Sequence, residues 1–158
     1  MQTFLPYPDF DRSACVLDNV RLGKQRVEVL QVVRALTRPV YGWKNHPAVL
    51  MWRGHEEALG AYGIAVCGEW RRRGFADTCE RKILDDLAAA GVPTPPRDQT
   101  ALERDGALPL WLGDDRVHRS HRSALIRKKP EWYGVRFPDD PADLPYTWPV
   151  RKTPDGAS

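Results

Sequence analysis

Apolar positions along the chain recur at the period of an α-helix, and the strict alternation typical of β-strands is absent. The segment 19–37 shows this best, because apolar residues at offsets of 7, 11 and 14 from the first share one helical face. These residues are Leu22, Val29, Val33 and Leu36. Asp18, a residue type favoured at helix N-caps, precedes the segment, and Pro39 follows it. The pattern predicts an all-α fold.

Four further helices are predicted from the same periodicity and from helix-starting and helix-breaking residues. They cover about 11–17, 47–73, 77–90 and 116–129, and a last short turn opens at Pro130. The 47–73 helix carries interior glycines at positions 54, 60, 63 and 68, each of which costs about 1 kcal/mol relative to alanine. We therefore expect this helix to need tertiary support, to use its glycines for close packing and to allow a break near 60–63.

One compact domain with a tail accounts for the rest of the chain. The sequence has 158 residues, of which 42% are hydrophobic and 28% charged, a composition that suits one folded core. We expect a helical domain over residues 1–137, which begins with an extended segment and docks the apolar stretch 108–111. A Pro-rich extension over 138–158 is expected to pack through Tyr146 and Trp148 and to fray near Thr153.

Several protein classes are disfavoured by what the sequence lacks. No apolar run reaches the roughly 18 residues that a membrane span needs, and the first residues lack the features of a signal peptide. We therefore expect a cytoplasmic protein that does not bind membranes. Cys15, Cys67 and Cys79 have no paired spacing, which argues against a disulfide framework and a cysteine-rich zinc site. No metal or other cofactor is expected.

Basic residues are concentrated in two places although the net charge is only +3. One block is Arg71-Arg72-Arg73, and the other extends from Arg116 to Lys129. A basic face on a nearly balanced protein suits an anionic ligand. The alternative is an ordinary solvated helix face.

The helix at 19–37 carries the first candidate site residues. Arg26 falls in its apolar arc, so its charge must be paired or must face a cleft, where it would bind phosphate. Another stripe of the same helix contains Arg21, Lys24, Gln25 and Glu28. Glu28 is a candidate for proton transfer or for orienting a water molecule. The alternative is that Lys24 and Glu28 form a surface ion pair and that Arg26 snorkels to solvent.

Two further clusters are candidates for ligand contact. In the loop 43–46, Lys44 precedes a helix N-terminus, which suits an anion, and Trp43 is of a type that stacks on bases. Asn45 or His46 would cap that helix; alternatively, Trp43 belongs to the core. His118 and His121 lie three residues apart on one helix face, which suits phosphate binding or proton transfer. Metal binding or simple packing are the other interpretations.

Three runs in this order resemble the pyrimidine-dimer DNA glycosylase (phage endonuclease V-like) family. They are LGKQRVE at 22–28, GWKNHP at 42–47 and HRSHRSALIRKKPEWY at 118–133. The likeness covers most of the chain up to Phe137, and the whole chain is similar to bacterial proteins often placed beside that family. The resemblance implies a compact all-α fold and a DNA repair enzyme.

The resemblance also implies site residues and a mechanism. In that family the N-terminal α-amine attacks the sugar carbon of the damaged nucleotide, forming an imine before strand cleavage. Carried over, the amine is that of Met1, the phosphate-binding arginines are Arg21 and Arg26, and the basic helix with Arg122 and Arg127 contacts the DNA backbone. The family's Arg-Glu pair corresponds to Arg26-Val27 here, so that the nearest acid is Glu28, about 100° further around the helix.

These observations favour a DNA glycosylase, with or without abasic-site lyase activity, that acts as a monomer on a damaged or modified duplex. A non-catalytic nucleic-acid-binding module is the first alternative. The second is an enzyme for a small nucleoside-like metabolite in which His118 and His121 do the chemistry. Convergent polar groups in a cleft usually mark a site, so we expect at least three of four features to line one cavity. These features are Met1, Arg26 with Glu28, the 44–46 helix start, and the histidine pair.

Overall fold

The computed structural model describes residues 1–149, and every regular element within that range is an α-helix. The helices are α1 (Phe10–Val16), α2 (Asn19–Thr37), α3 (Pro47–Leu50), α4 (Glu56–Arg72), α5 (Cys79–Ala89), α6 (Gln99–Arg104), α7 (Asp115–Lys128) and α8 (Pro130–Arg136). The all-α prediction is therefore confirmed. Within residues 1–149, none of the helices combines the length and the apolar character that a membrane span requires.

Helix α2 has the predicted bounds, and its predicted apolar face forms part of the core. Leu22, Val29 and Val33 are completely buried. Asp18 stands at the N-cap with extended backbone, but its side chain does not cap the helix. Instead it accepts hydrogen bonds from the hydroxyl of Tyr133 and from Arg21. The residue thus joins α2 to α8 and to an arginine of the candidate site.

The predicted helix 47–73 is wrong as a single element, because it is divided into α3 and α4. The break lies at Gly54, whose φ of 83° is left-handed and is tolerated by a residue without a side chain. The buried Trp52 in this turn donates its indole N–H to Thr3. Helix α4 then continues without interruption through residues 60–63, so the break is not where the sequence pattern suggested.

Two of the glycines inside α4, Gly60 and Gly63, allow the close packing that the sequence predicted. A Cβ atom on Gly60 would lie 2.6 Å from Cδ1 of Leu87, and one on Gly63 would lie 2.9 Å from Cγ1 of Val29. Helix α4 therefore approaches α5 through Gly60 and α2 through Gly63. These three helices supply half of the buried residues of the hydrophobic core.

Helix α6 and the course of the following loop were not predicted. Asp98 caps α6 by accepting a hydrogen bond from the Ala101 N–H, and Leu102 is its one buried residue. The apolar stretch 108–111 is docked only in part. Leu108 and Trp111 pack against the core, whereas Leu110 is 100% exposed.

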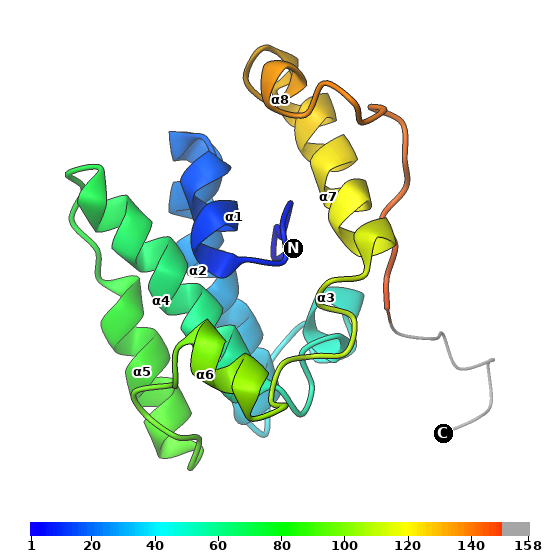
Figure 1. Cartoon of the computed structure of the whole chain (residues 1–158). Coiled ribbons are helices and arrows are strands. Elements are labelled where there is room, and N and C mark those ends of the chain that lie inside the picture. The colour runs from blue at the N-terminus through cyan, green and yellow to red at the C-terminus, as the bar shows by residue number, and fades with distance from the viewer. Residues whose placement is uncertain (150–158) are drawn as a thin grey trace.

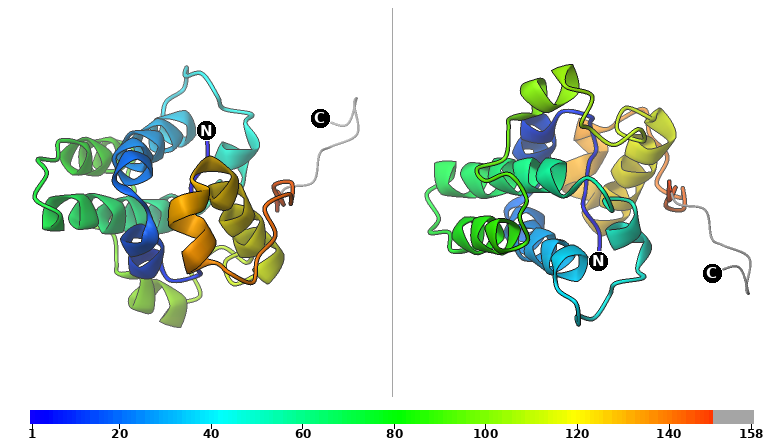
Figure 2. Two further views of the ribbon diagram at one scale, coloured as in Figure 1. Left: turned by 90° about the horizontal axis from the view of Figure 1, so that it is seen from above. Right: turned by 90° about the horizontal axis from the view of Figure 1, so that it is seen from below.

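The N-terminal segment occupies the middle of the fold. Figures 1 and 2 show it between the group formed by α2 and α4 and the pair formed by α7 and α8. Beyond Phe137 the chain returns along α7, where the Ser123 hydroxyl and the Arg127 guanidinium bond to its backbone. Tyr146 and Trp148 pack against the core. The expected fraying near Thr153 lies outside the described residues.

Replacing Gly63 with alanine should destabilise the fold despite alanine's better helix propensity. The added methyl meets branched side chains of α2 and α5, and overpacking of this kind costs about 1–3 kcal/mol. Gly68→Ala is the matched control, because its Cβ would meet nothing closer than 4.0 Å; it should stabilise α4 by about 0.5–1 kcal/mol. Urea unfolding of the two variants measures both changes, and equal stabilisation by both would contradict the packing argument.

Candidate active site

A mostly polar cavity of about 320 Å³ opens beside the N-terminus. Its walls come from the N-terminal segment, one face of α2, the end of α7 and the C-terminal tail. The lining residues are Met1, Gln2, Phe4, Val20, Arg21, Lys24, Glu28, Lys128 and Tyr146. Segments separated by more than a hundred residues thus meet at one place.

Helix α2 places one acidic and two basic side chains on the cavity wall. Arg21, Lys24 and Glu28 are three, four and seven residues apart, so they share the helix face expected from the sequence. The Glu28 side chain is 14% exposed, and its Oε1 lies 4.0 Å from the Nζ of Lys24, which is 73% exposed. Val27 is 43% exposed and does not line the cavity. Glu28 is therefore the acid that α2 presents beside Met1.

Residues 2–4 are held by side chains of α2. The Gln2 N–H donates to Oε2 of Glu28 at 3.2 Å. Gln25, which is buried, donates to the Gln2 carbonyl at 2.8 Å and accepts from the Phe4 N–H at 2.7 Å. An extended segment normally satisfies its backbone through a neighbouring strand. Here one amide side chain performs that role and sets the register of the N-terminus against α2.

Two buried aromatic residues also bond to the same segment. The indole of Trp52 donates to the Thr3 hydroxyl at 3.0 Å, and the Tyr62 hydroxyl of α4 donates to the Phe4 carbonyl. Both rings are completely buried and stack on each other. The segment is consequently held by Trp52 and by a residue of α4 in addition to α2.

The two histidines of α7 bind the next residue of the segment, Leu5. The Leu5 N–H donates to Nδ1 of His121 at 3.0 Å. His118 accepts the Gly113 N–H at Nε2, so the neutral ring carries its proton on Nδ1 and donates it to the Leu5 carbonyl at 2.8 Å. The two rings therefore use opposite tautomers to satisfy both backbone groups of one residue.

Both histidines stay neutral in the fold. Burial lowers the pKa of His121 to about 3 and also lowers the pKa of His118. Neither ring lines the cavity. Proton transfer by His118 and His121, as proposed from the sequence, does not fit this arrangement. Their contacts instead position the N-terminal segment.

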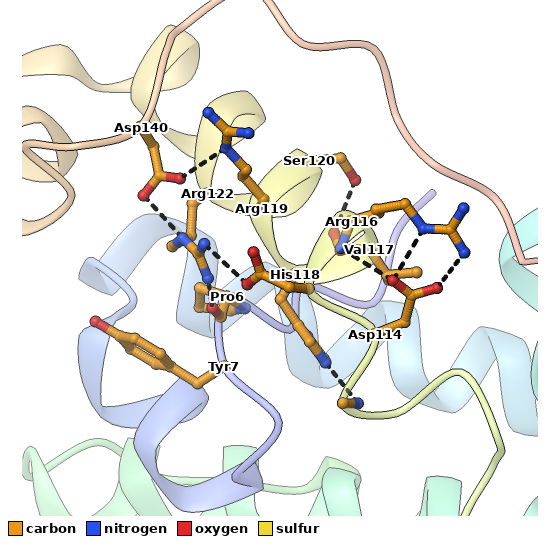
Figure 3. A network of polar contacts seen from close by, with 12 residues as sticks. Pro6, Tyr7, Asp114, Arg116, Val117, His118, Arg119, Ser120, Arg122 and Asp140 are labelled. Carbon is orange, nitrogen blue, oxygen red and sulfur yellow. Dashed lines mark hydrogen bonds and ion pairs between the residues drawn. The ribbon is translucent and has the colours of Figure 1, made fainter.

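Arg122 and Arg127, which the sequence suggested as phosphate contacts, are bonded to groups of the protein itself. Arg122 donates to Asp140 and to the Pro6 carbonyl, and Figure 3 shows its guanidinium between these acceptors. Arg127 donates to the carbonyls of Ala142 and Leu144 in the tail. These arginines hold the N-terminal segment and the tail on α7; the Arg122 side chain is mostly enclosed, whereas Arg127 is exposed.

Arg26 lies on the opposite side of α2 from the cavity residues. It pairs with Asp77 at the start of α5, and its guanidinium lies 4.4 Å from the ring centroid of Trp70. The sequence required this charge to be paired or to face a cleft, and the structure shows a pair. Arg26 thus joins α2 to α5 and is not available to a phosphate at the cavity.

The loop before α3 is built differently from an anion site. Lys44 donates its ammonium to the Ala35 carbonyl, and His46 caps α3 by accepting the Ala48 N–H. Asn45 is exposed, and Trp43 is 60% exposed rather than part of the core. Burial and then the positive charge of the N-terminus lower the pKa of His46, whereas Glu28 opposes them. The charges of the terminus and of Glu28 therefore both act on His46.

The structure brings together fewer of the proposed features than expected. Met1 and Glu28 line the cavity, whereas Arg26, the 44–46 helix start and the histidine pair do not, so the expectation of at least three features is wrong. Lys128 and Tyr146 line the cavity but were not singled out. Lys128 belongs to the predicted basic block, whereas nothing in the sequence placed Tyr146 beside residue 1. Residues 1–149 hold no group of three or more potential metal ligands.

Comparison with known protein families finds a match for the first half of the chain. A family model described as pyrimidine dimer DNA glycosylase matches residues 1–83, which include the N-terminal segment and α2. No curated protein matches the chain, and no solved structure matches it.

Acid should destabilise the fold through His121. Its pKa is about 3 in the folded chain against about 6.5 when unfolded, so below pH 6.5 only the unfolded chain takes up the proton. Stability is complete above pH 6.5 and falls by about 1.4 kcal/mol per pH unit between pH 6 and 4.5. In His121→Asn, the amide oxygen can still accept from Leu5 but cannot titrate, so urea unfolding should show a shallower pH dependence. An unchanged slope would contradict this, and His55→Gln, outside the segment's contacts, is the control.

Proposed function

The chain belongs to the pyrimidine dimer DNA glycosylase family, and we propose that it removes a damaged or modified base from DNA by attack of the Met1 α-amine on C1′ of the nucleotide. The observation that carries this proposal is the cavity that Met1 shares with Glu28. An uncharged α-amine is a competent nucleophile at neutral pH. The amine displaces the base, the C1′–N bond breaks, and the base leaves with a proton.

We assign Glu28 the acid–base role at this amine. Its carboxylate is mostly buried and accepts the N–H of Gln2, the residue next to the nucleophile. After ring opening gives the C1′ imine, abstraction of a C2′ proton by Glu28 would expel the 3′ phosphate. That step is the abasic-site lyase reaction, and it leaves the amine attached to the sugar until hydrolysis. No cofactor enters this sequence of steps.

The basic side chains of the cavity are suited to the DNA backbone. Arg21 is held by Asp18, whereas Lys24 and Lys128 are exposed at the rim. These two lysines replace Arg122 and Arg127 as our proposed phosphate contacts. A single-domain module that only binds DNA would use the same lysines without forming a covalent intermediate, so chemistry distinguishes it from the enzyme. The metabolite alternative loses its support, because its two histidines are buried and bound to Leu5.

Borohydride should trap a covalent adduct between the protein and a duplex carrying an abasic site. An N-terminal tag should abolish trapping, because it replaces the Met1 amine with an amide. Glu28→Gln keeps an acceptor for Gln2 but removes the base, so strand cleavage should slow by about 100-fold or more. Glu131→Gln on the exposed start of α8 is the control. A tagged protein that is trapped as well as the untagged one would eliminate the amine mechanism.

The affinity for duplex DNA should depend on salt through the two rim lysines. Each phosphate that a lysine neutralises contributes about 0.9 to the slope of log affinity against log salt. Lys24→Ala and Lys128→Ala should each reduce that slope by about 1 and weaken binding to every sequence alike. Arg81→Ala removes an exposed charge on α5 and should leave the slope unchanged. Titrations by fluorescence anisotropy at several salt concentrations measure the slopes, and unchanged values in both lysine variants would refute these contacts.

A further inference from the structure

Aromatic rings form a continuous series from the cavity to the surface. Tyr146 lines the cavity, and its ring centroid lies 5.3 Å from that of Trp148. Trp148 lies 5.9 Å from His46, and His46 lies 5.8 Å from Trp43. We call these four residues the aromatic rim. The loop before α3 supplies two of the rings and the C-terminal tail supplies the others.

Trp43 ends the rim in a position that core packing does not explain. It is 60% exposed, whereas Trp52 in the following turn is completely buried. Its φ of 69° is left-handed, which bulky residues rarely adopt. The loop is held in place on both sides, because Lys44 bonds to the Ala35 carbonyl and the His46 N–H donates to the Trp43 carbonyl. The backbone thus holds a large ring outward in a fixed place.

The surroundings of the rim indicate what kind of ligand would cover it. The adjoining cavity carries Arg21, Lys24 and Lys128, which suit phosphates, while the rim itself offers flat rings. A ligand that alternates phosphates with flat rings is a nucleic acid, and its bases are exposed for stacking where they are unpaired. A peptide would need backbone or charged partners along the rim, and Lys44 is already used within the loop.

We propose that the aromatic rim is a second subsite, which stacks one unpaired nucleobase next to the nucleotide held in the cavity. This inference rests on the proposed function, because it places the rim beside a nucleotide bound at Met1. Trp43 supplies the outer stacking surface. His46 and Trp148 connect it to Tyr146, so that the subsite and the cavity share a wall.

Affinity measurements test the role of Trp43. Stacking on one aromatic side chain contributes enough that its loss should weaken binding by about 5- to 150-fold. Trp43→Ala should show this loss for a duplex with a tetrahydrofuran abasic analogue, and Trp43→Phe should recover most of it. Leu110→Ala, which removes a fully exposed apolar side chain outside the rim, should bind as the unaltered protein does. Equal affinities for all four proteins would overturn the proposal.

Photocrosslinking separates this inference from the proposed chemistry. A 5-iodouracil opposite the tetrahydrofuran analogue should crosslink to a peptide containing Trp43 or Trp148; crosslinks confined to other segments would overturn the subsite. Borohydride trapping of Trp43→Ala at saturating abasic DNA should remain, because the cavity keeps Met1 and Glu28. Trapping without an effect of Trp43 on affinity would refute the subsite alone. Crosslinking at the rim without trapping by the unaltered protein would refute the amine mechanism alone.

Discussion

The arrangement of the whole molecule depends on burying an extended N-terminal segment inside a helical protein. Residues 1–149 contain no strand that could pair with its backbone N–H and C=O groups. Each buried group left without a partner costs about 1–3 kcal/mol. Side chains from several helices supply the partners: Gln25, Tyr62, His118, His121 and Arg122. Because these side chains reach residues up to 116 positions away, they also join α7 to the rest of the core.

This constraint explains why the interior contains so many polar residues. Gln25, His118 and His121 are almost completely buried, a situation that often marks an active site. Here their polar atoms are mainly used by the backbone of residues 2–5, and burial keeps both histidines neutral. Among residues 1–149, those exposed to the cavity are a different set, in which Glu28 is the one acid. The buried polar residues hold the segment in place, whereas the proposed reaction takes place at the accessible end of the segment.

The sequence was sufficient to predict those features of the fold that depend on a single helix. Periodicity gave α2 and α7, and it placed Lys24 and Glu28 on one face, as the structure has them. It could not give contacts that join a side chain to a distant backbone, so His118 and His121 were interpreted as catalytic. It also missed the break at Gly54, because a glycine within a periodic segment can either pack closely, as Gly63 does, or adopt a left-handed turn. Only the packing around each glycine distinguishes the two outcomes.

A terminal amine is an unfavourable nucleophile unless something fixes its position, since the ends of protein chains usually fray. In this fold the register of the segment is set twice, by Gln25 at residues 2 and 4 and by the histidine pair at residue 5. A shift by one residue would break both sets of hydrogen bonds and move the terminus by about 3.5 Å. Precise placement of reacting groups is worth several kcal/mol in catalysis. The interactions that bury the segment therefore also provide the geometry that the proposed reaction at Met1 requires.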